Sequence, residues 1–393
     1  MRRACCFLLS AVCGCSDEAN RESWIVSADA CSHTMPAPRS VRVGREGTSE
    51  VFVHVQGGAK LVAYSASGAL AANIALAVGA QDAARFADGL IVVGQGTPPD
   101  GGVRAPYVAF VDAAGKPRWV TRFSESSSAR DMAVGVQFSV FVHEGTIAVT
   151  VSTTSGSVGV GGVSVADGLA LVGPDGKVTA VTPIDHGEGH ALVAFDRDGV
   201  IVGRTALLPA GGFSIAAFDL SAKPRWRHTF ETGSLTSLAR CLDGVVASAA
   251  GSARDLEATT SSAAAGPWLL RFDPSGGRLA STRAPGAGAV AACDARGIVA
   301  AGVMFGILMD PRFPPIGAAD RWGSYLATFP FDGARGELRE FGAGHTRITA
   351  IGALGDYVHV AGSYRGSVHF GASSVTSCAS DAPTDDVFVA RIH

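Results

Sequence analysis

The sequence predicts an all-β protein, a closed seven-bladed β-propeller of four-stranded blades, and three observations support this prediction. The chain contains 50 glycines in 393 residues and few long stretches of helical periodicity, which favours strands joined by many turns. A short turn followed by an apolar strand recurs along most of the chain. The two chain ends carry complementary parts of one repeat, so that the ring can close.

The first recurring feature is an Asp-Gly turn, or a close relative, that leads into an apolar strand. Its glycines lie 45 to 58 residues apart, at Gly89, Gly145, Gly199, Gly244, Gly297 and Gly355. A seventh copy with a looser turn lies upstream, at residues 50–55. Short strands that recur at about 45 to 60 residues are typical of propeller blades.

A second pair of strands follows each copy, joined by an Asp-x-x-Gly turn. The clearest example is residues 107–123, where Asp112 and Gly115 form the turn and Trp119 opens the next strand. Lys-Pro-Arg-Trp occurs twice, at 116–119 and 223–226. With a short apolar strand before each Asp-Gly turn, the unit contains four strands, A to D. The A–B and C–D turns then lie on one face of the ring, and the longer B–C and D–A connections lie on the other.

The chain ends on strands A, B and C of a blade that has no strand D. Residues 23–29 supply the missing strand, and Trp24 takes the position of Trp119 and Trp226 in their blades. We therefore expect a seventh blade made of residues 344–393 and this N-terminal strand. Such closure removes the free sheet edges that promote aggregation.

The N-terminus has the features of a targeting segment. Arg2 and Arg3 precede a nine-residue run, 4–12, that is apolar except for Ser10 and too short to span a bilayer, which takes roughly 20 apolar residues. The following Gly14-Cys15 resembles a bacterial lipoprotein signal and implies a lipidated Cys15, although Cys13 stands where that motif usually has Ala, Ser or Thr. Cys13 as the acceptor and plain secretion remain alternatives.

We accordingly expect a signal peptide at 1–14, a tether at 15–22 and a single propeller domain at 23–393. Ser16 gives no cue for retention in the inner membrane. The expected location is the cell envelope, with a lipid anchor in the outer membrane, or outside the cell.

The C-terminal repeat carries a family resemblance. Residues 361–371 and 385–392 resemble the β-propeller repeat of bacterial secreted and lipid-anchored proteins (SBBP-type), whose pattern is Gly-x-x-x-Gly, Phe-Gly and Asp-x-Phe-Val-Ala-Lys-Leu. The match covers the seventh blade and is degenerate elsewhere. The Asp-x-x-Gly-Lys-x-x-Trp stretches are similar to repeats of quinoprotein dehydrogenases and of outer-membrane assembly propellers. These resemblances imply a fold rather than a function, because propellers host many activities.

Four cysteines outside the signal, Cys31, Cys241, Cys293 and Cys378, would remain in an oxidising compartment. We expect a disulfide between Cys31 and Cys378, because the first follows the D strand of the seventh blade and the second lies in its B–C loop. Cys241 and Cys293 occupy nearly equivalent A-strand positions, and we expect them to stay as small buried hydrophobic residues.

The sequence predicts no metal site and no nucleic-acid-binding surface in its loops. Asp185, His186, Glu188 and His190 place four metal-ligand types in six residues, but their spacing matches no metal motif, so we expect a solvated loop without metal. The acidic run that contains Asp381, Asp385 and Asp386 is expected to be a polar loop, with a calcium site as the alternative. A net charge of −3 with scattered Lys and Arg gives no surface for nucleic acid.

No motif for a catalytic nucleophile or a phosphate-binding loop is present. The one adjacent cysteine pair, Cys5-Cys6, falls in the signal, which argues against a quinone cofactor. We therefore assign no catalytic residue and no cofactor. The leading hypothesis is a monomeric, lipid-anchored binding or scaffold protein that presents its variable loops to a protein or glycan. The alternatives are a quinoprotein-like or hydrolytic enzyme with a site at the channel mouth, and a scaffold in outer-membrane assembly.

One loop is unusually apolar. Residues 303–316, between strands B and C of the sixth blade, contain few polar side chains and are followed by Trp322. Phe305, Met309, Phe313 and Trp322 form a candidate partner patch near the channel mouth. The alternative is an extra hairpin whose apolar side chains pack against the blade. The exposure of the four side chains separates the two interpretations.

Overall fold

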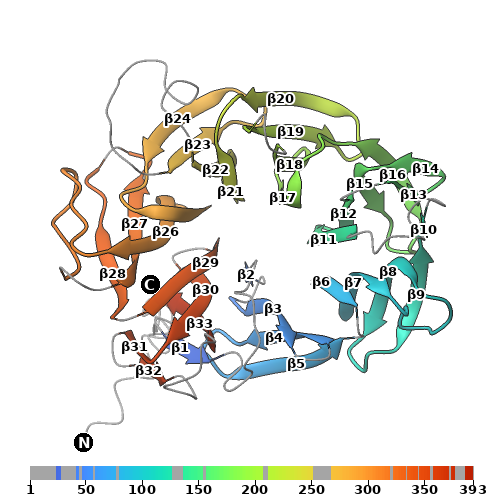
Figure 1. Ribbon diagram of the computed structural model, residues 1–393, viewed down its shortest axis with the longest axis horizontal. Helices are drawn as coiled ribbons and strands as arrows, with labels where there is room; N and C mark the ends of the chain where they lie inside the picture. Colours follow the sequence, from blue (N-terminus) through green and yellow to red (C-terminus); the bar gives the residue numbers. More distant parts are fainter. Residues whose placement is uncertain are drawn as a thin grey trace, which may run out of the picture.

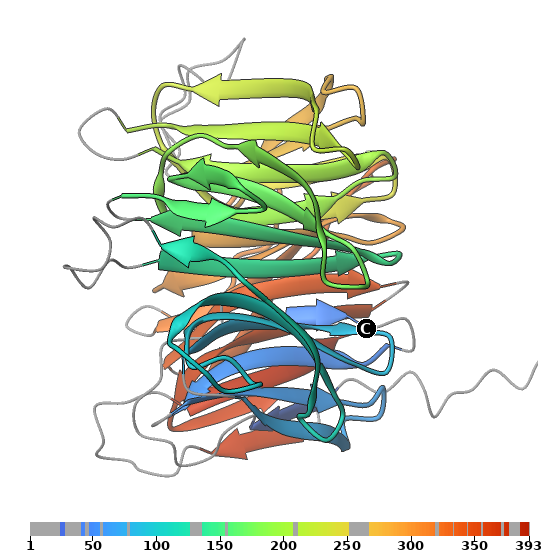
Figure 2. The same cartoon turned by 90° about the vertical axis from the view of Figure 1, so that its right-hand side faces the viewer.

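The computed structural model is a ring of seven four-stranded antiparallel sheets around a common centre (Figure 1). Seen edge-on, the strands run between the two faces of the ring (Figure 2). The structure describes residues 24–27, 41–43, 47–55, 58–76, 79–125, 136–153, 156–206, 211–250, 267–318, 322–332, 334–343, 345–354, 357–370, 373–376 and 386–392. Within these residues, no helix is long and apolar enough to cross a membrane.

The predicted seven-bladed propeller is confirmed. From the centre outward, the first four blades are β2 Val41–Val43, β3 Ser49–Val55, β4 Gly58–Tyr64, β5 Leu70–Leu76; β6 Ala80–Phe86, β7 Gly89–Gly96, β8 Ala105–Asp112, β9 Pro117–Arg122; β11 Val136–His143, β12 Thr146–Thr153, β15 Asp167–Val172, β16 Val178–Pro183; and β17 Glu188–Phe195, β18 Gly199–Thr205, β19 Phe213–Asp219, β20 Pro224–Phe230. The last three are β21 Ser234–Cys241, β22 Gly244–Ala250, β23 Trp268–Phe272, β24 Arg278–Arg283; β25 Ala287–Cys293, β26 Gly297–Phe305, β27 Trp322–Pro330, β28 Leu338–Ala343; and β29 His345–Leu354, β30 Tyr357–Arg365, β33 Asp386–Ile392, β1 Trp24–Ser27.

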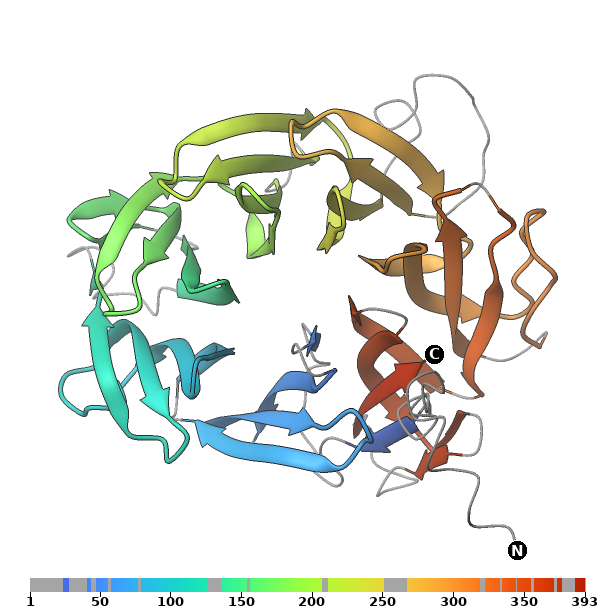
Figure 3. The same ribbon diagram turned by 180° about the vertical axis from the view of Figure 1, so that it is seen from behind.

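The ring closes as the sequence predicts. The N-terminal strand β1 pairs with β33 as the outer strand of the seventh blade (Figure 3). Trp24 lies opposite Arg391, just as Trp119 lies opposite Phe110 and Trp226 opposite Ala217. The two chain ends therefore share one sheet, and the described strand is shorter than the predicted 23–29.

Two small elements extend the ring. In the seventh blade, β31 Ser367–Phe370 and β32 Ser373–Thr376 form a hairpin between strands B and C, and Val368 is fully buried. Beside the third blade, β10 Ser124–Glu125, β13 Val158–Val160 and β14 Val163–Val165 form a three-stranded sheet. The predicted extra hairpin is thus present in the seventh blade. In the described part of the corresponding loop of the sixth, residues 306–318, the structure instead has a bridge between Leu308 and Ile316.

The core lies between neighbouring blades. Strands B and C are covered on both faces, so they read as continuous apolar runs, and every residue of β33 is buried. One cluster joins the second blade to the third through side chains such as Val93, Val108, Phe138 and Val149. Each blade therefore depends on its neighbours for the burial of its apolar faces.

The C–D turns, Asp-x-x-Gly at Asp112 and Asp273 and Asp-x-x-Ala at Asp219, owe their shape to the aspartate. Asp219 Oδ1 accepts the backbone N–H groups of Ser221 and Lys223 at 2.8 and 2.9 Å, and the corresponding Asp112 and Asp273 accept two N–H groups each. These hydrogen bonds, with that to Lys223 first, hold the pKa of Asp219 below its usual value. Such Asx turns are the reason why aspartate recurs at this point of the repeat.

Candidate functional site

A pocket whose lining includes several charged side chains lies on the loop face at the junction of the third and fourth blades. It encloses about 450 Å³. Its lining residues are Asp185, His186, Arg204, Ala206, Gly211, Phe213, Ser214, Arg227, Thr229, Phe230 and Glu231. They come from β18, β19, β20 and the connection between β16 and β17, not from β17 itself. We expected a site at the channel mouth, but this pocket lies further out from the centre of the ring.

The floor of the pocket is a buried network around Asp167, the first residue of β15. Arg204 Nη2 donates to Asp167 Oδ1 at 2.6 Å and to Ser152 Oγ at 2.7 Å. Ser152 Oγ donates to the same carboxylate oxygen, and His186 Nδ1 contacts the other one. Asp167 and Arg204 are each only 3% exposed.

Burial has a cost for this network. It lowers the pKa of Arg204, while the charges of Asp167 and Asp185 oppose that change. Arg204 also donates to the Gly187 carbonyl at 2.5 Å, so several acceptors share its guanidinium. A buried ion pair is only weak evidence for stability, because two charges lose their hydration. Its presence at this junction therefore calls for an explanation in terms of blade register or of a ligand.

The rim of the pocket carries a second ion pair. Arg227 Nη2 lies 2.8 Å from Asp185 Oδ1, and the Arg227 side chain is more than half exposed. Ser214 and Thr229 add hydroxyl groups, and Glu231 is exposed beside them. The pocket can therefore both donate and accept hydrogen bonds.

We predicted that residues 185–190 form a solvated loop, but the structure shows that part of this segment contacts a buried network. Asp185 and His186 line the pocket, and His186, although exposed, reaches the buried Asp167. The side chains of Glu188 and His190 lie outside the described part of the structure. Among the described residues, no group of three or more His, Cys, Asp or Glu side chains is placed to hold a metal ion.

Sequence reasoning missed Asp167, Arg204 and Arg227. A signal for Arg204 was present, since it stands five residues after the turn glycine in an apolar B strand. After four of the other turn glycines, the same position is small or hydroxylated, at Gly94, Thr150, Ala249 and Gly302, and after Gly355 it is Val360. An isolated charge in a strand that is buried on both faces indicates a specific partner.

The candidate partner patch is brought together only in part. Phe305, Met309 and Trp322 are 59%, 76% and 48% exposed, whereas Phe313 is 7% exposed. The rings of Phe305 and Trp322 lie 4.9 Å apart. Phe313 instead packs edge-on against Phe329 at 5.7 Å, so its assignment to the exposed patch was wrong.

The loop that carries this patch lies at the outer rim of the sixth blade, not at the channel mouth (Figure 1, orange). Arg312 donates to Thr282 Oγ1 at 2.9 Å and to the Arg283 carbonyl at 2.6 Å. Both partners belong to β24, the outer strand of the fifth blade. The loop is thus fastened across the rim, with its buried ring inward and the exposed side chains outward.

The cysteines differ from our expectation. Cys241 and Cys293 are buried, as predicted, but they form a disulfide, with their Cα atoms 5.0 Å apart. The bond joins β21 of the fifth blade to β25 of the sixth. It forms because equivalent positions of adjacent A strands lie side by side, which the sequence alone does not reveal. Cys15, Cys31 and Cys378 lie outside the described residues, so their roles stay predictions. Asp381 and Asp385 also lie outside these residues, whereas Asp386 is a buried residue of β33 and does not belong to a polar loop.

Comparisons with known proteins support the fold. No family model and no curated protein matches the sequence. Virginiamycin B lyase from Staphylococcus aureus matches with a TM-score of 0.51 and 9% identity, over 95% of this chain and 99% of that one. Puromycin hydrolase matches with a TM-score of 0.52 and 14% identity, over 90% of this chain and 55% of that one. BBS1N, solved in complex with ARL6DN, matches with a TM-score of 0.47 and 10% identity, over 94% of this chain and 97% of that one. At such identities, the likeness to solved structures establishes the β-propeller fold and nothing about activity.

Proposed function

We propose that this protein is a monomeric, lipid-anchored propeller of the bacterial cell envelope that binds a neutral, hydroxyl-rich glycan. The observation that carries the proposal is the pocket at the junction of the third and fourth blades, whose lining combines aromatic side chains with paired charges and hydroxyl groups. Its volume of about 450 Å³ falls in the range of small-ligand sites. A concave pocket of this size suits a sugar better than the flat surface of a folded protein.

The charges of the pocket indicate the class of ligand. Arg204 is paired with Asp167 and Arg227 with Asp185, so each guanidinium among the described lining residues already has a carboxylate partner. An anionic ligand would meet no uncompensated positive charge. A sugar hydroxyl can both donate to Asp185 or Glu231 and accept from Arg227, because these groups offer complementary hydrogen bonds.

Two features support the location. The basic start, the apolar run 4–12 and Gly14-Cys15 resemble a lipoprotein signal. The Cys241–Cys293 disulfide suits a compartment where thiols are oxidised. Replacement of Cys15 by Ser should release the protein from the membrane fraction, with Cys13→Ser as the control. Unchanged detergent partitioning of the Cys15 variant would remove the anchor from the proposal.

A glycan microarray tests the ligand. The purified full chain carrying Cys15→Ser should bind neutral oligosaccharides, and Arg227→Gln should weaken binding by roughly tenfold, because a charge-assisted hydrogen bond is lost. Arg339→Gln is the matched control, since Arg339 is equally exposed and equally paired, with Glu337. Binding that persists in Arg227→Gln, or that is confined to sulfated and carboxylated glycans, would contradict the proposal.

A hydrolytic enzyme is the second candidate, and the contact between His186 and Asp167 favours it. A buried carboxylate against Nδ1 orients an imidazole so that Nε2 can accept a proton from water. No nucleophile is required if water attacks the substrate directly. Release of new reducing ends from a bound glycan, abolished in His186→Gln, would establish catalysis and replace the binding-only proposal.

A further inference from the structure

The outer rim of the sixth blade carries a group of exposed apolar side chains that the glycan pocket does not use. Phe305 ends β26, Trp322 begins β27, and Ile307 and Met309 lie in the loop between them. All four are about half exposed or more. An aromatic pair with two flexible apolar neighbours, all facing solvent, marks an interaction site rather than ordinary surface.

The rim patch, defined as Phe305, Ile307, Met309 and Trp322, sits on a rigid base. Phe313 anchors the same loop in the core beside Phe329. Arg312 binds β24, and the bridge between Leu308 and Ile316 holds the two sides of the loop together. The loop is therefore already ordered before binding. The exposed side chains should lose little conformational entropy when they bind.

The position of the patch relative to the start of the chain indicates what it binds. In the seventh blade, β31 packs against β28, and β32 packs against β1. β28, β31, β32 and β1 therefore lie side by side at the outside of the ring, from the sixth blade to the first described strand (Figure 1). The tether 15–22 is eight residues long and spans at most roughly 28 Å when extended. A bilayer that holds a lipidated Cys15 therefore lies within reach of this rim.

The start of β1, to which the tether is attached, and the rim patch lie at opposite faces of the ring. β1 begins at the end where Trp24 pairs with Arg391, close to the C–D turns, whereas Phe305 and Trp322 lie at the loop face. The nine residues of β27 separate the two faces by about 30 Å. A fully extended tether has nearly this length, so a ring that stands on its edge can place both on one bilayer.

We propose that the rim patch inserts into the lipid bilayer and holds the propeller on its edge, with the sixth and seventh blades toward the membrane. This inference rests on the proposed lipid anchor and adds a second membrane contact to it. Trp and Phe favour the interfacial region of a bilayer, and apolar side chains gain free energy on entering it. Two weak contacts reinforce each other, because the anchor raises the effective concentration of the patch at the surface.

Vesicle binding of the unlipidated protein tests the patch by itself. The full chain with Cys15→Ser is mixed with phosphatidylethanolamine–phosphatidylglycerol vesicles that contain a brominated lipid. We expect co-sedimentation and quenching of tryptophan fluorescence. Phe305→Ser combined with Trp322→Ser should lower the partition coefficient by roughly tenfold or more. The control is Leu220→Ser combined with Leu242→Ser, which removes two apolar side chains that are at least half exposed from turns of other blades and should leave vesicle binding unchanged.

Equal vesicle binding of the Phe305/Trp322 variant and its parent would overturn the proposal, as would absence of binding by the parent. Capture of a protein in lipid-free detergent that depends on the same two residues, without vesicle binding, would also overturn it in favour of a protein partner. The anchor fails separately, if Cys15→Ser leaves membrane partitioning in cells unchanged. Patch-dependent vesicle binding would in that case stand by itself as a peripheral membrane contact.

Discussion

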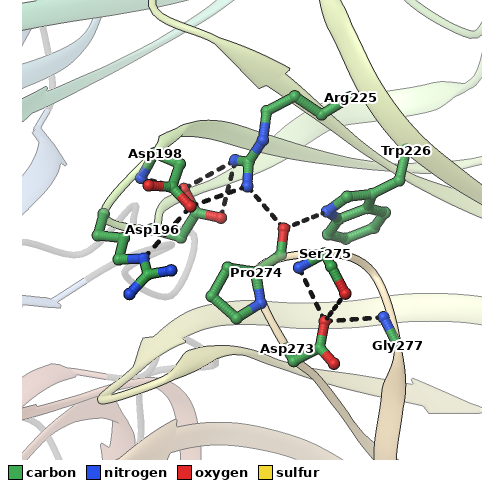
Figure 4. Close-up of polar contacts among 9 residues, drawn as sticks. Asp196, Asp198, Arg225, Trp226, Asp273, Pro274, Ser275 and Gly277 are labelled. Carbon is green, nitrogen blue, oxygen red and sulfur yellow. Dashed lines mark hydrogen bonds and ion pairs between the residues drawn. The ribbon is translucent and has the colours of Figure 1, made fainter.

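Two junctions of the ring, between the fourth and fifth blades and between the fifth and sixth, solve the same packing problem by different chemistry. At the first (Figure 4), Trp226 Nε1 and Arg225 Nη2 both donate to the Pro274 carbonyl of the next blade, at 2.9 and 2.6 Å. Arg225 also binds both carboxylate oxygens of Asp196. The indole ring lies so close over Gly276 that an added Cβ would come within 2.7 Å of it.

The second junction lacks this arrangement. Ala280 pairs with Arg271 where Trp226 pairs with Ala217, and a cavity of about 380 Å³ opens there. Phe331 reaches back from the sixth blade and lies 3.9 Å under the Arg271 guanidinium. At the inner end of the same junction, the Cys241–Cys293 disulfide joins the two blades covalently.

The difference shows how a degenerate repeat keeps a closed ring. Lys-Pro-Arg-Trp is the device that fastens one blade to the C–D turn of the next, as at Trp119 and Pro174 between the second and third blades. At the junction of the fifth and sixth blades, where Ala280 takes the place of the tryptophan, a cation–π contact and a disulfide join the two blades instead. Stability is therefore distributed over junctions of unequal kind.

The disulfide should give the largest effect. Replacing Cys241 and Cys293 by Ser should lower the free energy of unfolding by about 4 kcal/mol on the chain-entropy model, given their separation of 52 residues. Urea denaturation measures the change, with oxidised and reduced wild type compared in parallel. A reduced protein as stable as the oxidised one would mean that Phe331 and Arg271 hold this junction without help.

Trp226→Ala removes a stacked ring and a hydrogen bond from the other junction, and should cost ~3 kcal/mol in urea unfolding. The control is Trp322→Ala, whose side chain is exposed and packs mainly on Phe305, with an expected change below about 1 kcal/mol. If the two variants lose the same stability, the indole is not what fastens the fourth blade to the fifth.

A third junction, where the ring closes, should respond to pH. Burial lowers the pKa of His359 on β30 from 6.5 to about 4, with help from the Arg391 charge, and Nδ1 lies 2.5 Å from Ser49 Oγ of the first blade. The unfolded chain binds a proton at higher pH than the folded one, so stability is full above pH 6.5 and falls toward pH 4. The free energy of unfolding should fall by about 3 kcal/mol over this range. The difference in this free energy between wild type and His359→Gln should change with pH in the same way. A pH-independent difference would refute the assignment.

The smallest effect is expected from Ala280→Leu, which should partly fill the cavity at the second junction and raise stability by about 1 kcal/mol. Thermal unfolding, which should shift upward by a few degrees at most for a protein of this size, gives the measurement. Ala72→Leu, at the corresponding position of the first blade opposite Ala63, serves as the control. A gain at both sites would point to strand propensity rather than to the cavity.

The strand repeat, the turn chemistry, the number of blades and the closure by β1 could all be predicted from the sequence. Each of these depends on local preferences, such as Asp219 accepting the N–H groups of its own turn, and local preferences leave a periodic trace. Three outcomes became apparent only in the folded ring: Cys241 bonds to Cys293, Arg204 and His186 both contact Asp167, and Phe313 turns inward while Phe305 and Trp322 stay exposed. These outcomes depend on packing between blades whose residues lie tens of positions apart, and no local pattern records which side chains face each other across a junction.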